Sequence, residues 1–402
     1  MKKNYRLRVA FAGMATLLGC CLFILSGCKE EKGKSVFDLV TPGKAQPVID
    51  SLSPAGSALA GADIITIYGK NFSSTLAENF IYFNGKAAKI LSATTTKLVV
   101  NSAVDSGTQA VKVTVAGAEL YSAPVAYKLL LAVEPFGTVS PPSTGAAALA
   151  TDSSSNLYFD LLGTGTDNGI YILSPNGNQT KYIPKTPGIT YWRALKRGPA
   201  NALYGVRGAS AVFLVASTDT AFQVWARTSA AVADLDFDQS QNIWAGGNTT
   251  ALDCFKLDKS ITSTPFDGAV HALRVYNGYL YFSATKDSVE KVLRAPISGT
   301  SLGTIEDYFN ITSAVGTLYS GQAITFSSNG YMYVGTQAPL GVIVVAPDKS
   351  FSTPYSAYSA MFGTMISSVA WGPGELLYGA TAEGSLFKIH TRKTGAPYYG
   401  VK

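Results

Sequence analysis

A short apolar phrase recurs six times in the C-terminal part of the chain. Each copy runs from a small or polar residue through an aliphatic residue to an aromatic one, and the aromatics are Tyr158, Tyr204, Trp244, Tyr281, Tyr333 and Tyr378. Successive aromatics lie 46, 40, 37, 52 and 45 residues apart. A repeat of about 45 residues that contains several strands and turns is typical of a β-propeller, with one four-stranded blade per repeat. The pattern therefore predicts six blades over residues 129–402.

Each repeat follows the same order of strands and turns. In the fifth copy an apolar run at 323–326 leads through a polar turn into 331–335, and two further runs complete the unit. One blade cannot bury both of its faces alone, so we expect each blade to stack on two neighbours. We therefore assign the repeated aromatics to packing between blades. Residues 129–139 are expected to add the outer strand that closes the last blade.

A second pattern of short strands occupies residues 47–128. This segment contains about seven strand-like runs, and Asn84-Gly85 predicts a tight hairpin because both residues tolerate positive φ. So many short strands in so few residues predict an immunoglobulin-like sandwich. The chain as a whole is therefore expected to be all-β, a sandwich followed by a six-bladed propeller.

Both modules resemble known families. Residues 47–128 resemble the IPT/TIG family through Ile49, Ser53-Pro54, Gly61, the segment 67–72 and Phe83-Asn84-Gly85. That resemblance implies an immunoglobulin-like fold used as a spacer or a binding module, and we expect a spacer here. The repeats resemble the NHL class of six-bladed propellers, with similar copies at 149–158 and 235–244. The second and fourth repeats depart from it, because 197–200 and 276–278 replace the usual Asp-containing turn.

The N-terminus has the pattern of a targeting segment. Residues 1–27 combine a basic start with an apolar stretch at 9–24, and Leu25-Ser26-Gly27-Cys28 resembles a bacterial lipobox. The resemblance implies cleavage before Cys28 and lipidation of its thiol, with residues 28–46 as a tether on the outer membrane. Lys29-Glu30-Glu31 resembles the surface-export signal of Bacteroidota lipoproteins, which favours a cell-surface location over a periplasmic-facing one. An ordinary signal peptide or an uncleaved anchor stays open as an alternative.

Charge and cysteine content change once this segment is set aside. The chain has 32 Lys and Arg against 26 Asp and Glu, but four of the cations lie in the predicted signal peptide. The remaining balance of +2 shows no basic stripe, so we expect no nucleic-acid partner. Cys254 is then the one unmodified cysteine, which allows no disulfide within the chain, and we expect it to be a small buried hydrophobe.

Motifs for catalysis are missing from the sequence. The two histidines, His271 and His390, are distant from each other and lack acidic neighbours in sequence. No nucleophile elbow, zinc-protease motif, phosphate-binding loop or EF-hand loop occurs. We therefore predict no catalytic residue, no metal and no cofactor. The alternative is a propeller enzyme, either a lactonase-like hydrolase or a polysaccharide lyase, that uses central carboxylates and a cation.

The predicted function is binding of a glycan or a protein partner through propeller loops. Aromatic side chains beside hydrogen-bonding groups suit sugar rings and protein anchors alike. The cluster around Trp192 is the most suggestive, although Tyr191 and Trp192 can instead seal the first two blades. The candidate ligand-binding residues are Tyr191, Trp192, Arg193, Arg207, Trp225, Arg227, Asp160, Asp167, Lys286 and Glu383.

Overall fold

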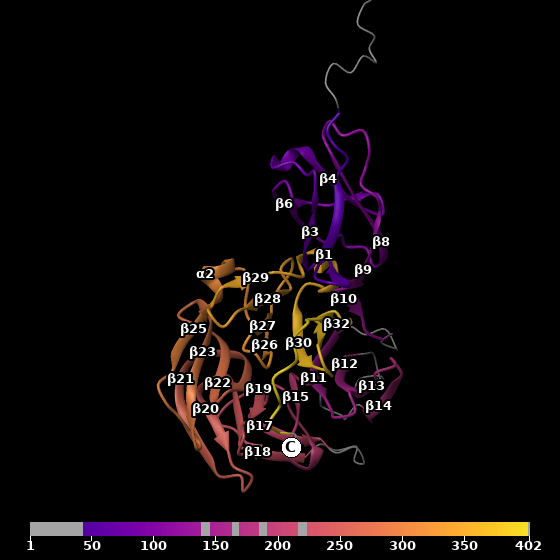
Figure 1. Cartoon of the computed structure of the whole chain (residues 1–402). Helices are drawn as coiled ribbons and strands as arrows, with labels where there is room; N and C mark the ends of the chain where they lie inside the picture. The colour runs from indigo at the N-terminus through magenta and orange to yellow at the C-terminus, as the bar shows by residue number, and fades with distance from the viewer. Residues whose placement is uncertain (1–42, 138–144, 163–168, 185–190, 216–222, 401–402) are drawn as a thin grey trace, which may run out of the picture.

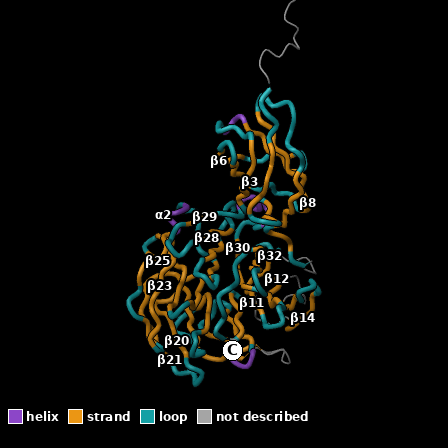
Figure 2. Tube along the Cα trace, in the orientation of Figure 1, coloured by secondary structure: helices purple, strands orange, loops and turns teal. Residues whose placement is uncertain are grey.

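The protein is described by a computed structural model that covers residues 43–137, 145–162, 169–184, 191–215 and 223–400. Two β modules are visible, a small sandwich and a larger ring of blades that the sandwich contacts at its rim (Figure 1). Strands and loops make up almost the whole trace (Figure 2). The all-β architecture predicted from the sequence is confirmed.

The first module packs two sheets face to face. One sheet has the order β1 (Val48–Ser53), β3 (Ile64–Lys70), β7 (Lys97–Asn101), β6 (Ile90–Ala93), and the other has β2 (Ser57–Ala60), β9 (Val125–Leu131), β8 (Gly107–Val115), β4 (Asn79–Phe83), β5 (Lys86–Ala87). Alternate side chains point inward, so Ile65, Ile67, Val111 and Val113 are fully buried. This is the immunoglobulin-like core that the sequence predicts.

Six blades form the second module. Blade 1 contains β11 (Gly145–Thr151), β12 (Leu157–Leu162), β13 (Gly169–Leu173) and β14 (Gln179–Pro184), and blade 2 contains β15 (Ala194–Arg197), β16 (Leu203–Val206), β17 (Ala211–Val215) and β18 (Gln223–Arg227). Blade 5 contains β26 (Ala323–Phe326), β27 (Met332–Gly335), β28 (Val342–Val345) and β29 (Phe351–Ser352). In each of these blades every strand is antiparallel to the next.

Blades 3 and 4 are continuous through one long strand. Their strands are β19 (Val232–Phe237), β20 (Ile243–Phe255), β21 (Ile261–Tyr276), β22 (Tyr279–Lys286), β23 (Val289–Ser298), β24 (Ser301–Leu302) and β25 (Glu306–Asn310). The first part of β21 pairs with β20, and the second part pairs with β22. β21 therefore serves blade 3 with one half and blade 4 with the other.

The ring closes by pairing two distant parts of the chain. Blade 6 contains β30 (Ile366–Trp371), β31 (Leu376–Thr381) and β32 (Leu386–His390), and its outer strand is β10 (Val133–Pro135). β10 precedes blade 1 in sequence and lies within the segment 129–139 that we expected to close the ring. Closure of this kind ties the start of the propeller to its end, and residues of blades 1 and 6 share one buried cluster.

The repeated aromatics lie in the contacts between blades, as the sequence predicts. Each of the six is buried. Tyr204 meets Phe237 with ring centroids 5.3 Å apart, and Tyr333 meets Trp371 at 5.4 Å. In both pairs an aromatic of a second strand packs on the residue that ends the first strand of the following blade. This recurring contact explains why the phrase is repeated.

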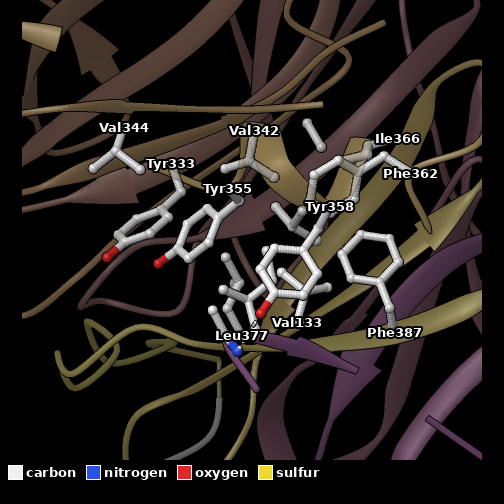
Figure 3. Packing of buried hydrophobic residues seen from close by; sticks show 14 of the residues in the cluster. Val133, Tyr333, Val342, Val344, Tyr355, Tyr358, Phe362, Ile366, Leu377 and Phe387 are labelled. Atoms are coloured by element: carbon white, nitrogen blue, oxygen red, sulfur yellow. Dashed lines mark hydrogen bonds between the residues drawn. The ribbon is translucent and has the colours of Figure 1, made fainter. Parts of the chain in front are cut away.

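The sandwich is fastened to blades 5 and 6 through a short helix, η4 (Ser356–Met361). Figure 3 shows Tyr358 from this helix beside Val133, with Phe362 facing Phe387. The Tyr358 hydroxyl donates to the carbonyl of Ala60 at 2.6 Å and accepts from the N–H of Ala132 at 3.2 Å. The two modules therefore share one buried cluster at this contact.

Candidate functional site

The chain segment after β32 crosses one mouth of the propeller channel. The N–H of Ser328 donates to the Thr394 carbonyl at 2.8 Å, and the N–H of Trp371 donates to the Tyr398 hydroxyl at 3.0 Å. Farther along, Gly400 packs so tightly on blade 2 that a side chain there would collide with the Arg197 carbonyl. We call residues 391–400 the C-terminal tail. Because it contacts the ends of several first strands, it covers this mouth of the channel.

Buried charges inside the ring hold the tail in place. Arg274 of β21 pairs with Asp236 of β19 at 2.9 Å, and both side chains are 1% exposed. The same guanidinium donates to the Ala396 and Pro397 carbonyls at 3.0 and 2.9 Å, and lies 4.1 Å from the centre of the Tyr398 ring. A buried cation is stabilised by an opposite charge and by hydrogen bonds from its N–H groups, and here both terminal nitrogens have partners while Nε has none among the described residues. Arg274 thus links blades 3 and 4 to the tail.

A second buried pair lies close to the first. Lys196 of β15 is 3.5 Å from Asp234 of β19, and the Asp234 carboxylate also accepts the N–H groups of Leu235 and Leu273. Burial raises the pKa of Asp234, and the Lys196 charge opposes that shift. Burial alone would lower the pKa of Lys196, but the two neighbouring carboxylates raise it overall. Lys196 and Arg274 therefore balance the charges of Asp234 and Asp236, and each of these four groups has an oppositely charged partner.

The opposite mouth is formed by loops that precede the first strands and by loops that join the second and third strands, and three of the predicted candidates lie there in blade 2. Arg193 is exposed, and its Nε donates to the Tyr191 hydroxyl at 3.3 Å. It lies against Gly208, where a Cβ would be 3.3 Å from Nε. The neighbouring Arg207 stacks on Phe213 with its guanidinium carbon 5.0 Å from the ring centre. We call Tyr191, Arg193 and Arg207 the arginine patch.

Two other candidates are structural, which corrects their assignment to ligand-binding loops. Trp192 is 5% exposed and meets Phe213 edge to face at 5.7 Å. Asp160 belongs to strand β12, is 2% exposed, and accepts the N–H of Trp192 at 2.7 Å. Together they seal blade 1 against blade 2, so their side chains offer almost no surface to a ligand.

The remaining candidates are spread over different blades. Trp225 and Arg227 lie in the outer strand β18, and Trp225 packs against Tyr204 at 5.7 Å. Lys286 ends β22, and Glu383 accepts the N–H of Thr364 at 2.8 Å and so fixes the loop before β30. Burial acts to raise the pKa of Glu383, but its hydrogen bonds with Thr364 outweigh that effect and lower it. Asp167 and Cys28 lie outside the described residues.

Both histidines have glutamate partners that are distant from them in sequence. His271 Nε2 lies 3.5 Å from a carboxylate oxygen of Glu290, and His390 Nε2 lies 2.8 Å from one of Glu134. The second pair joins β32 to the closing strand β10. Each pair unites residues from different strands, so sequence neighbours could not reveal it.

Neither a metal cluster nor a membrane-spanning helix is found in the described residues. No group of three or more His, Cys, Asp or Glu side chains there is placed to hold a metal ion. Among the same residues no helix has the length and apolar character needed to cross a bilayer.

Comparison with known proteins identifies the first module. Residues 47–129 match the family model of the IPT/TIG domain. These residues form an IPT/TIG domain. No curated protein matches the sequence.

Solved structures with similar folds include an auxiliary nutrient binding protein from Bacteroides thetaiotaomicron. It is 12% identical with a TM-score of 0.51, over 86% of this chain and 97% of the other. The propeller alone is too short for that coverage, so the similarity extends into the IPT/TIG domain. The calcium-binding protein regucalcin from Agrobacterium tumefaciens is 13% identical with a TM-score of 0.51, over 66% of this chain and 97% of its own. A luciferin-regenerating enzyme is 14% identical with a TM-score of 0.52, over 67% of this chain and 99% of its own. At these identities the likeness shows the fold alone, an IPT/TIG domain followed by a β-propeller.

Proposed function

We propose that this chain is a lipid-anchored protein of the bacterial cell envelope that binds a glycan through the propeller loops. The IPT/TIG domain acts as a spacer between the anchor at Cys28 and the propeller. The observation that carries this proposal is the arginine patch at the mouth that the tail leaves uncovered. The resemblance to a Bacteroides nutrient binding protein adds support at the level of architecture.

The patch suits a glycan that carries carboxylates. Within the described part of the chain, the one hydrogen bond of the Arg193 guanidinium is its Nε contact with Tyr191, so its two terminal nitrogens can donate to a ligand. A planar guanidinium binds a carboxylate with two parallel hydrogen bonds. The Tyr191 ring, 5.9 Å from the Arg193 guanidinium carbon, supplies an apolar surface for a sugar ring beside that charge.

Calorimetry with acidic and neutral polysaccharides tests the proposal. The full-length chain in detergent should bind polygalacturonate or alginate, and Arg193→Ala should weaken binding by about tenfold, as expected for the loss of a charged hydrogen-bonded contact. The matched control is Lys256→Ala, which removes an exposed cation from a turn of blade 3. Equal binding by Arg193→Ala and wild type would contradict the site.

The same polysaccharides distinguish binding from catalysis. An assay for new reducing ends or unsaturated products should show no turnover over hours at the concentrations used for calorimetry. Product formation by the wild-type chain would establish the alternative function of a propeller hydrolase or lyase. A chain that binds no polysaccharide but captures a defined envelope protein, with Arg193 required, would make the ligand a protein instead.

A further inference from the structure

A groove of about 420 Å³ opens on the face that carries the C-terminal tail. Its walls are the turn after β11 in blade 1, the turn after β30 in blade 6, and residues 394–398 of the tail. These are the first and last blades of the ring. The groove therefore lies at the junction that the closing strand holds together, on the face opposite the arginine patch.

All three walls are fixed by hydrogen bonds. In the blade 1 turn, one carboxylate oxygen of Asp152 accepts the N–H groups of Ser154 and Asn156, both at 2.9 Å. The Thr151 hydroxyl donates to the Trp371 carbonyl at 2.7 Å and so joins the first two walls. The third wall is held by the Trp371–Tyr398 contact described above. A groove built in this way is already formed before a ligand arrives, which lowers the entropic cost of binding.

The tail lines the groove beside blades 1 and 6 and packs closely on the other blades that it contacts. On blades 2 and 3, a side chain added at Gly400 would collide with the Arg197 carbonyl and the Phe237 ring. On blade 5, Gly395 forms a β-bridge with Ser327. Beside blades 1 and 6 the tail packs on Trp371 through Gly395 and Tyr398, and residues 394–398 line the groove together with the two turns. Its path leaves a concave site of the size that small-molecule ligands occupy, roughly 300–1,000 Å³.

The lining favours a neutral molecule rich in hydroxyl groups. Among the described residues that line the groove there is no Lys or Arg, and Asp152 is the one carboxylate. Ser153 and Ser155 bring hydroxyls, while Pro373 and Tyr398 bring apolar ring surfaces. Sugars present hydroxyl edges and C–H faces that match such a surface. Within the described residues the lining offers no cation to pair with an anionic ligand.

We propose that this groove is a second binding site and that it takes a neutral saccharide of one or two rings. The proposal does not depend on the arginine patch, since the two sites lie on different faces and one favours an acidic ligand while the other favours a neutral one. Its ligand is distinguished from that of the patch by the absence of a carboxylate.

The test places a large side chain in the groove at an exposed turn position. Ser153 is exposed in the turn 152–156, and Gln239 is exposed at the same position of the equivalent turn, 238–242, in blade 3. Asp238 organises that turn as Asp152 does in blade 1, accepting the N–H groups of Ser240 and Asn242 at 2.9 Å. Ser153→Trp should therefore block the groove, while Gln239→Trp adds the same bulk at a matched turn outside it.

Calorimetry of the full-length chain with maltose, cellobiose and xylobiose gives the readout. At least one disaccharide should bind, Ser153→Trp should weaken that binding by at least about tenfold, and Gln239→Trp and Arg193→Ala should leave it unchanged. A crystal soaked with the bound disaccharide should show it between the two turns and the tail. Failure of all three disaccharides to bind, unchanged binding in Ser153→Trp, or loss in Arg193→Ala would overturn the proposal. Loss of disaccharide binding in Arg193→Ala would also place the sugar at the arginine patch. The experiment therefore distinguishes failure of the groove proposal from failure of the patch proposal.

Discussion

Replacing Asp160 by Asn should stabilise the propeller at alkaline pH. The Asp160 carboxylate is 2% exposed and accepts the N–H of Trp192. Burial raises its pKa to about 7, and the Trp192 hydrogen bond opposes the shift only in part. Asn has nearly the same shape, retains a carbonyl oxygen for the Trp192 N–H, and carries no charge at any pH.

The sign of the effect follows from proton linkage. A carboxyl whose pKa is higher in the folded state favours folding fully below its unfolded pKa, and this contribution is lost as pH rises through the folded pKa. For Asp160 the window extends from its ordinary value of 3.8 to about 7. At 1.36 kcal/mol per pKa unit, the wild-type chain loses about 4 kcal/mol across that window. The advantage of the Asn variant should therefore widen by about 3 kcal/mol between pH 5 and pH 8.

Urea unfolding at the two pH values measures this difference. All four tryptophans, at positions 192, 225, 244 and 371, lie in the propeller, so their emission reports the unfolding of that module. Asp348→Asn is the control, because Asp348 is exposed and its pKa is lowered by hydrogen bonds from Ser350. The control should show no gain at pH 8. A constant difference between Asp160→Asn and wild type across the pH range would refute the reasoning.

Three further results are expected. Tyr358→Phe should cost about 1–3 kcal/mol in urea unfolding, because the Ala60 carbonyl and the Ala132 N–H lose their shared partner inside the module contact; no change would mean that water replaces the hydroxyl. Arg274→Met should lower the free energy of unfolding by about 3–5 kcal/mol, because it leaves the buried Asp236 carboxylate without its cationic partner. The same variant should be cleaved faster by trypsin within the tail, as followed by mass spectrometry. Cys254 should resist a thiol reagent until urea is added, because the residue is fully buried and burial raises its pKa to about 12; rapid reaction of the native chain would contradict its placement.

Much of the fold could be predicted because it repeats. An aromatic such as Tyr204 recurs in every blade because every blade must meet its neighbour in the same way, and this repetition is visible in one sequence. The closing strand was also accessible, since residues 129–139 continue the strand pattern ahead of blade 1. Local rules therefore suffice where the same contact is made many times.

The candidate site could be predicted only in part, because it depends on contacts made once. Trp192 and Arg193 are adjacent in sequence, yet the first is buried against Phe213 and the second is exposed. This difference in burial depends on where β15 begins, which is set by the pairing of Ala194 with Val206. The glutamate partners of the histidines come from other strands. The tail that covers one mouth contains no sequence motif from which its contacts with the blades could be predicted.

The buried pairs inside the ring make the channel itself a poor binding site. A ligand entering it would have to separate Lys196 from Asp234 or Arg274 from Asp236, and removing one partner of a buried pair costs several kcal/mol. With the tail across one mouth, such a ligand would also meet a closed end. This is consistent with the two proposed sites on the outer faces, where the arginine patch and the groove share no residue. Effects at sites that are far apart and share no partner add, so a chain that carries both Arg193→Ala and Ser153→Trp should lose acidic and neutral saccharides independently.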